Sequence, residues 1–210
     1  MRVAVCQLDL SDDADMEVRA AHNRAGCEAG IRRAAASGAD LIVLPERAFG
    51  GNVFASKRDA LQLAEPLTGG PVLAEWCQLS ESLGVLIAGS FLEVDDDENV
   101  YNSCALIEDG EIKAVHRKAH TFEIEDGVFT PGNAVPPVVD TRCGSIGLLV
   151  CYDAEFPEYF RMPCLAGADI VVVPVAWADV EPAPSGERRM DIVRLQAAAG
   201  ANHVFVAVAN

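Results

Sequence analysis

A cysteine, a lysine and two glutamates occupy positions in this sequence where side chains can do acid–base and nucleophilic chemistry. Glu46 directly follows the apolar run and proline at 41–45. Its carboxyl is therefore predicted to be partly desolvated, which would raise its pKa and make it a usable general base. Cys151 follows the apolar run 145–150 and precedes a helix start at Pro157. Such a turn exposes a nucleophile and points backbone N–H groups at developing negative charge.

Each candidate also has an ordinary structural interpretation. Glu46 could be a solvated loop glutamate, and Cys151 could be a buried structural cysteine, as the other six cysteines are predicted to be. Lys118 lies in the basic stretch HRKAH, which could be a charged strand end. Glu125 is one of several acids in the loop that follows. No single residue decides between these interpretations.

Two other chemistries fit the sequence poorly. His116 and His120 have the i, i+4 spacing of a metal pair on a helix, but this segment follows a predicted strand and no third ligand is evident. No metal site is therefore predicted. A papain-like pair would need a histidine beside Cys151, and the downstream candidate, His203, begins a strand predicted to be buried.

The elements that must position these residues alternate between strands and helices. Strands are predicted at residues 2–8, 41–44, 85–93, 101–108, 111–117, 138–141, 145–150, 170–173 and 204–209, and helices at 17–37, 71–83, after Pro157, and at about 187–199. The stretch GADLIVLP is echoed by GADIVVVP, each after a predicted helix. This repetition predicts an α/β sheet with covering helices. The first copy ends at Glu46 and the second runs on to Trp177, so one strand end carries a carboxylate and the other an aromatic side chain that could wall a pocket. The alternative is that the two units are merely similar and share no site.

Length and charge bound the function further. The chain has 210 residues, half of them hydrophobic, which predicts a single domain over 1–210. A balance of 16 Lys and Arg against 32 Asp and Glu gives a net charge of −16. Such a surface disfavours binding to nucleic acid or to anionic membranes. There is no long apolar run or export signal, and the seven cysteines have no CxxC spacing, which together favour a cytoplasmic protein with free thiols.

Taken together, the motifs resemble the nitrilase superfamily of carbon–nitrogen hydrolases. The matching stretches, in the family's order, are GADLIVLPE, YNS, HRKAH, FTPG, CYDAEFPE and GADIVVVPVAW. The resemblance implies a four-layer α-β-β-α sandwich, assembled as a homodimer or larger homo-oligomer, with no metal or organic cofactor. It also implies a Glu–Lys–Cys triad and a further pocket glutamate, which fall on Glu46, Lys118, Cys151 and Glu125.

The resemblance also implies a role for each residue. Cys151 is the nucleophile and Glu46 the general base, while Lys118 and the backbone N–H of Tyr152 stabilise the oxyanion. Glu125 orients Lys118 or the amide nitrogen of the substrate. Trp177 is expected to wall the pocket, with core packing as an equal alternative.

The substrate class stays open at this stage. The sequence after Cys151 resembles amidase-type branches, so a small primary amide, cleaved to carboxylic acid and ammonia, is the first choice. N-carbamoyl amines or amino acids are the second and nitriles the third. A non-catalytic relative that binds a small molecule or a partner is the rival from another class. Relatives run several dozen residues beyond the position of Asn210, so we expect a missing C-terminal extension and an open edge at the last strand.

Overall fold

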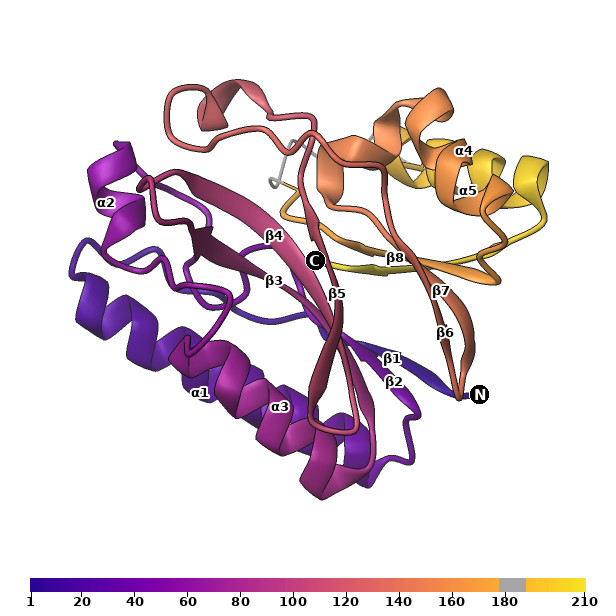
Figure 1. Ribbon diagram of the computed structural model, residues 1–210, viewed down its shortest axis with the longest axis horizontal. Coiled ribbons are helices and arrows are strands. Elements are labelled where there is room, and N and C mark those ends of the chain that lie inside the picture. The colour runs from indigo at the N-terminus through magenta and orange to yellow at the C-terminus, as the bar shows by residue number, and fades with distance from the viewer. Residues whose placement is uncertain (178–187) are drawn as a thin grey trace.

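Two β-sheets lie face to face in this computed structural model, and helices cover the outer face of each (Figure 1). The structure describes residues 1–177 and 188–210. The predicted four-layer α-β-β-α sandwich is confirmed. In chain order the elements are β1 (Val3–Val5), α1 (Met16–Ala36), β2 (Leu41–Val43), α2 (Lys57–Leu61), α3 (Pro71–Leu83), β3 (Leu86–Val94), β4 (Val100–Glu108), β5 (Glu111–Arg117), η1 (Glu123–Glu125), β6 (Val138–Thr141), β7 (Gly144–Leu148), η2 (Cys151–Glu155), α4 (Pro157–Leu165), β8 (Ile170–Pro174), α5 (Met190–Asn202) and β9 (Phe205–Ala209).

The two sheets share a plan in which parallel strands meet an antiparallel hairpin. The first sheet has the order β1-β2-β3-β4-β5, with β1, β2 and β3 parallel and β3, β4 and β5 antiparallel. The second has the order β6-β7-β8-β9, with the β6–β7 pair antiparallel and β7, β8 and β9 parallel. A proline lies at the carboxyl end of each echoed strand, two residues after β2 (Pro45) and as the last residue of β8 (Pro174), which is where α/β proteins gather ligand chemistry.

Alternation along the strands explains the layers. In β2, Leu41 and Val43 face the other sheet, while Ile42 and the following Leu44 face helices α1 and α3. Both sets are fully buried. A strand with two apolar faces must be covered on both sides. This is why its sequence is a continuous apolar run instead of an alternating one.

Helix ends follow ordinary capping chemistry. Asp15 caps α1, since its carboxylate accepts hydrogen bonds from the backbone N–H groups of Glu17 and Val18 at 3.0 and 3.2 Å. At α3, proline occupies the first turn and the buried carboxylate of Glu65 accepts from Val72 and Leu73 N–H, at 2.9 Å each. The predicted helices therefore begin within a residue of their observed starts, apart from the last one. Part of that helix, predicted at about 187–199, lies outside the described residues.

One predicted strand was too long, and three short elements were not predicted. The strand predicted at 2–8 is β1, which pairs only over Val3–Val5. The backbone N–H of Cys6 donates to Val43 O at 2.8 Å, and beyond this residue the chain no longer pairs with β2. The short helix α2 and the 3-10 turns η1 and η2 were not predicted, because turns of three to five residues are too short to show a periodic pattern.

The expected open edge is present at β9. No described strand pairs with its outer side, and Phe205 is 75% exposed there. In a separate observation, none of the described helices is long and apolar enough to cross a membrane.

The packing of α3 against the first sheet generates a stability prediction. Trp76 is 2% exposed and lies on Gly89, where an added Cβ would stand 2.8 Å from the indole. We expect Trp76→Ala to lower the free energy of unfolding by about 3–5 kcal/mol, because it leaves a cavity in the core. Urea denaturation measures the change. Val135→Ala, at a site that is 70% exposed, is the control and should stay within about 0.5 kcal/mol of the parent.

Candidate active site

The strand ends that carry the two copies of the echo meet between the sheets. Glu46 follows β2 in the first sheet, and its backbone N–H donates to Val175 O, just after β8 in the second sheet, at 3.1 Å. The Glu46 side chain is buried, with 1% of its surface exposed. The interpretation of Glu46 as a solvated loop residue is therefore wrong. The carboxyl ends of the two repeated units are therefore in direct contact.

Lys118 comes directly after β5, and its amine lies between two carboxylates. Nζ is 2.8 Å from Glu46 Oε1 and 2.6 Å from Glu125 Oε2. The Lys118 backbone is fixed as well, because its N–H donates to Asn102 O and its carbonyl accepts from Gly132 N–H, at 2.8 and 2.7 Å. Gly132 approaches so closely that an added Cβ would lie 2.2 Å from Arg117 O. The glycine of the FTPG stretch thus allows the loop to pack against the lysine.

Cys151 opens the 3-10 turn η2 with a left-handed backbone, φ 45°. This conformation is uncommon for a residue other than glycine and is frequent at functional sites. The thiol lies close enough to the Glu46 carboxylate, the Lys118 amine and the Ala176 N–H for each of them to shift its pKa. The structure therefore brings Glu46, Lys118 and Cys151 together, with Glu125 beside both Lys118 and Arg47.

The charges around Glu46 reverse one expectation. Burial alone would raise the pKa of this carboxyl, as the sequence analysis assumes. The positive charges of Arg47 and Lys118, with hydrogen bonds from Lys118 and Cys151, instead lower the pKa to about 2. The predicted direction of the shift was wrong. Desolvation alone would raise the pKa, but the cations that the fold brings to the site outweigh it.

The other two members of the triad shift in complementary ways. Burial raises the pKa of the Cys151 thiol, and the negative charge of Glu46 raises it further, against the lowering effect of Lys118. For Lys118, burial would lower the pKa, but the charges of Glu46 and Glu125 outweigh it and raise the pKa above its usual value. The resting site thus holds a neutral thiol, a carboxylate and an ammonium group.

Polar residues outside the predicted set hold both glutamates in place. Asn102 Nδ2 donates to Glu46 Oε1 at 2.7 Å and to Glu125 Oε1 at 3.1 Å. Ser90 Oγ donates to Asn102 Oδ1 at 2.7 Å and so fixes the orientation of the amide. The guanidinium of Arg47 also donates to both glutamates. The YNS stretch contains Asn102 and could have drawn attention to it, whereas no sequence pattern singled out Arg47.

Asp153 is a second missed residue, and it ties the cysteine turn to the lysine segment. Its carboxylate is fully buried and contacts His116 Nε2 at 2.9 Å and His120 Nδ1 at 2.8 Å. It also accepts from the backbone N–H groups of Ala119 and His120, at 3.1 and 2.9 Å. The two histidines that flank Lys118 therefore face a carboxylate two residues after Cys151. That contact explains their i, i+4 spacing without a metal.

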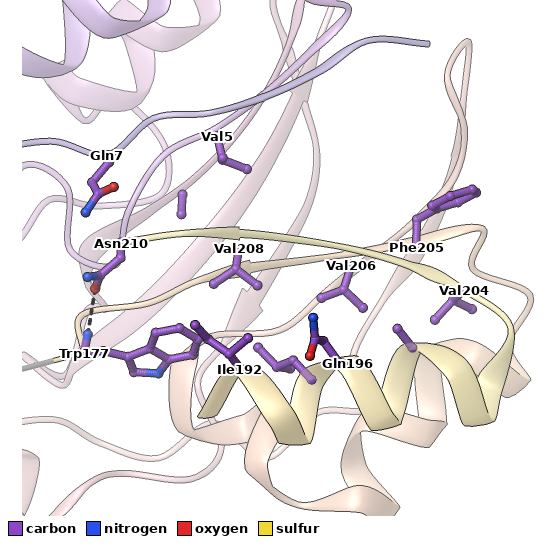
Figure 2. A pocket seen from close by; sticks show the side chains of 13 residues that line it. Val5, Gln7, Trp177, Ile192, Gln196, Val204, Phe205, Val206, Val208 and Asn210 are labelled. Carbon is purple, nitrogen blue, oxygen red and sulfur yellow. Dashed lines mark hydrogen bonds between the residues drawn. The ribbon is translucent and has the colours of Figure 1, made fainter. Parts of the chain in front are cut away.

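The two remaining predicted residues line the surroundings of the triad. The Tyr152 ring packs edge-on against Phe122 and Phe156, with centroids 5.3 and 5.1 Å apart, so its side chain belongs to an aromatic cluster. Trp177 lies beside Ile192 of α5, and its backbone N–H donates to Asn210 Oδ1 at 2.8 Å (Figure 2). Trp177 also lines a hollow of about 720 Å³ next to the Glu46 turn. It therefore both packs on α5 and walls this hollow.

Comparisons with known proteins agree with this geometry. The chain matches the family described as "Carbon-nitrogen hydrolase" over residues 2–210. It is 35% identical to N-carbamoylputrescine amidase of Arabidopsis thaliana, covering 99% of this chain and 70% of that protein. It is 34% identical to citrullinase of Francisella tularensis, covering 84% of this chain and 61% of that protein. The chain thus spans roughly two thirds of the length of these curated relatives.

A solved structure gives the same result. An amidase variant from Nesterenkonia sp. AN1, whose active-site cysteine carries the acetamide moiety of fluoroacetamide, superposes with a TM-score of 0.74 at 25% identity, covering 100% of this chain and 73% of that one. The chain belongs to the carbon–nitrogen hydrolase family, within the nitrilase superfamily. Several of the proteins that it resembles are amidases, so the predicted resemblance to the amidase-like branch is confirmed.

The contacts of Asp153 generate a prediction. We expect Asp153→Asn to lower the free energy of unfolding by about 1–3 kcal/mol, because an amide nitrogen would face donors in a buried site. Urea denaturation measures the change. Asp96→Asn, in an exposed loop, is the matched control and should leave stability within about 0.5 kcal/mol. Equal stability of Asp153→Asn and the parent would contradict the role assigned to this carboxylate.

Proposed function

We propose that this chain hydrolyses the carbon–nitrogen bond of a small primary amide through a cysteine acyl-enzyme, with Cys151 as nucleophile, Glu46 as base and Lys118 as oxyanion partner. One observation carries the proposal. Glu46 accepts a hydrogen bond from the Lys118 amine at 2.8 Å and lies near enough to the Cys151 thiol to shift its pKa, inside a buried site. An acid–base group, a nucleophile and an electrophilic cation within mutual contact are the parts that acyl transfer requires.

The first half of the reaction consumes the amide. Glu46 takes the thiol proton while the sulfur attacks the carbonyl carbon, and the carbonyl oxygen becomes an oxyanion beside Lys118 and the Tyr152 N–H. The tetrahedral intermediate then collapses. The carbon–nitrogen bond breaks, the protonated Glu46 gives its proton to the departing nitrogen, and ammonia leaves a thioester on Cys151.

The second half restores the enzyme. Glu46 takes a proton from water, and the resulting hydroxide attacks the thioester carbon beside the same oxyanion partners. The carbon–sulfur bond breaks, the carboxylic acid leaves, and the proton on Glu46 returns to Cys151. Glu125 supports both halves, because its contact with Lys118 Nζ at 2.6 Å directs the amine toward the site.

The pKa directions favour proton transfer and attack in one step. A thiol with a raised pKa does not give its proton to a carboxylate with a pKa of about 2 in the resting site. As a lone pair of the sulfur forms the carbon–sulfur bond, positive charge develops on the sulfur and makes its proton acidic enough for Glu46 to take, while the S–H electron pair stays on the sulfur. The negative charge then appears on the oxygen next to Lys118. The thiol therefore loses its proton to Glu46 only when a substrate carbonyl is in place to be attacked.

The substrate is a small polar molecule. The hollow beside the Glu46 turn is lined by polar side chains, among them Gln7, Asp9 and Asn52, together with apolar ones such as Trp177. Polar groups of this kind fix the orientation of a ligand. N-carbamoyl amines or amino acids are the second candidate class, which the similarity to N-carbamoylputrescine amidase favours. Nitriles remain the third.

Assembly and location stay predictions. We propose a homodimer or larger homo-oligomer in the cytoplasm, which sedimentation velocity and cell fractionation test.

Ammonia release tests the activity. Purified protein is assayed with a panel of primary amides, N-carbamoyl compounds and nitriles. We expect release with the first or second class, and we expect Cys151→Ala to reduce it by at least about a thousandfold, because no acyl-enzyme can form. Cys143→Ala, away from the site, is the control and should retain turnover. A panel without any ammonia release would favour the rival view that the chain binds a small molecule without turnover.

Thiol labelling tests the nucleophile separately. Iodoacetamide is itself a small primary amide, so the site should orient it against the Cys151 sulfur. We expect Cys151 to be alkylated before the other six cysteines, as followed by peptide mass spectrometry. Glu46→Gln should slow this labelling by at least about tenfold, since the proton acceptor is lost. Uniform labelling of all seven thiols would contradict an activated cysteine.

A further inference from the structure

Arg47 is a second buried cation beside the triad. It is 3% exposed and has a left-handed backbone, φ 48°, which turns its side chain back toward the site. Its NH1 group donates to Glu46 Oε1 at 3.3 Å and, at shorter range, to Glu125 Oε1. Its backbone N–H is fixed by Ser90 Oγ at 3.0 Å. The residue therefore reaches both carboxylates at once.

The guanidinium is held in place by its remaining contacts. Nε donates to Gly51 O at 3.3 Å and NH2 to Asn52 Oδ1 at 3.5 Å. Its carbon lies 5.8 Å from the centre of the Phe129 ring. The acidic side chain of Asp12 adds a favourable charge from the loop after β1. Because the guanidinium is planar and carries several N–H donors, it can bridge two carboxylates, which the single ammonium group of a lysine does less well.

Counting charges shows what Arg47 contributes. Two carboxylates, Glu46 and Glu125, face two cations, Arg47 and Lys118, and the Cys151 thiol is neutral. The buried cluster is therefore balanced. Without Arg47, Glu46 and Glu125 would share one ammonium group, and the loss of a neighbouring positive charge would favour the protonated form of Glu46. A protonated Glu46 cannot accept the thiol proton.

We propose that Arg47 is a positioning residue that supplies the second positive charge needed to keep Glu46 unprotonated, and so sets the lower pH limit of the cysteine chemistry. The inference rests on the proposed function of Glu46 as the base. Lys118 cannot serve alone, because its amine already divides its contacts between Glu46 and Glu125 and faces the developing oxyanion. Among the charges that lower the pKa of Glu46, that of Arg47 is the larger.

The test follows the pH dependence of Cys151 alkylation by iodoacetamide, which needs no identified substrate. In the parent, we expect the rate to hold steady on acidification until the protein unfolds, since the pKa of Glu46 is about 2. In Arg47→Met, the alkylation rate should fall on acidification because a carboxyl of the cluster binds a proton. We expect this fall at a pH at least about one unit above the pH at which the parent loses its rate. Arg47→Lys should restore most of the parent profile. Arg32→Met, at an exposed ion pair with Glu28 on α1, is the control.

A double variant separates the effect of charge from a general loss of structure. Arg47→Met with Glu125→Gln removes one charge of each sign, so the cluster is balanced again. We expect its pH profile to return to within about half a unit of the parent, with circular dichroism confirming that each variant is folded. A rate that falls equally at every pH in Arg47→Met, or additive losses in the double variant, would overturn the proposal. Missing ammonia release with these pH profiles intact would instead contradict the amidase assignment alone.

Discussion

The site depends on a balance of charges removed from water. Glu46 and Glu125 are buried next to Lys118 and Arg47, and Asn102 donates to both carboxylates. Isolated charges in such surroundings are costly, and a group left unpaired there shifts its pKa until it is neutral. Each charged partner therefore keeps the others in the ionisation state that the chemistry needs. Loss of one partner changes the base, the oxyanion partner and the thiol together.

The architecture supplies this balance from both sheets. Glu46 follows β2 and Lys118 follows β5 in the first sheet, whereas Cys151 follows β7 in the second. Two contacts hold the sheets in register at this end, namely the hydrogen bond from Glu46 N–H to Val175 O and the Asp153 carboxylate between the two histidines. The mainly apolar interior between the sheets provides the low dielectric that makes these contacts strong.

Much of this arrangement could be predicted from the sequence, because it depends on local patterns. Apolar runs and turn residues identify the strands, and the position after a buried strand singles out Glu46 and Cys151. The direction of the Glu46 pKa shift could not be predicted in the same way. It depends on Lys118, 72 residues away along the chain. Arg47 sits beside Glu46 in the sequence, yet its role depends on a backbone conformation, φ 48°, that no periodic pattern indicates. The contacts of Asp153 likewise exist only once β5 and η2 are packed together.

The division of the triad between two sheets has a consequence for how heat inactivates the protein. Away from the site, the two sheets are joined largely by apolar side-chain packing, and at the far end Arg142 donates to Glu108 of the first sheet. A slippage of about one ångström between them would separate the sulfur from its base, while every helix and strand stayed intact. Mild heating should therefore abolish the catalytic activity at a temperature below the one at which the circular dichroism changes, and cooling should restore the activity.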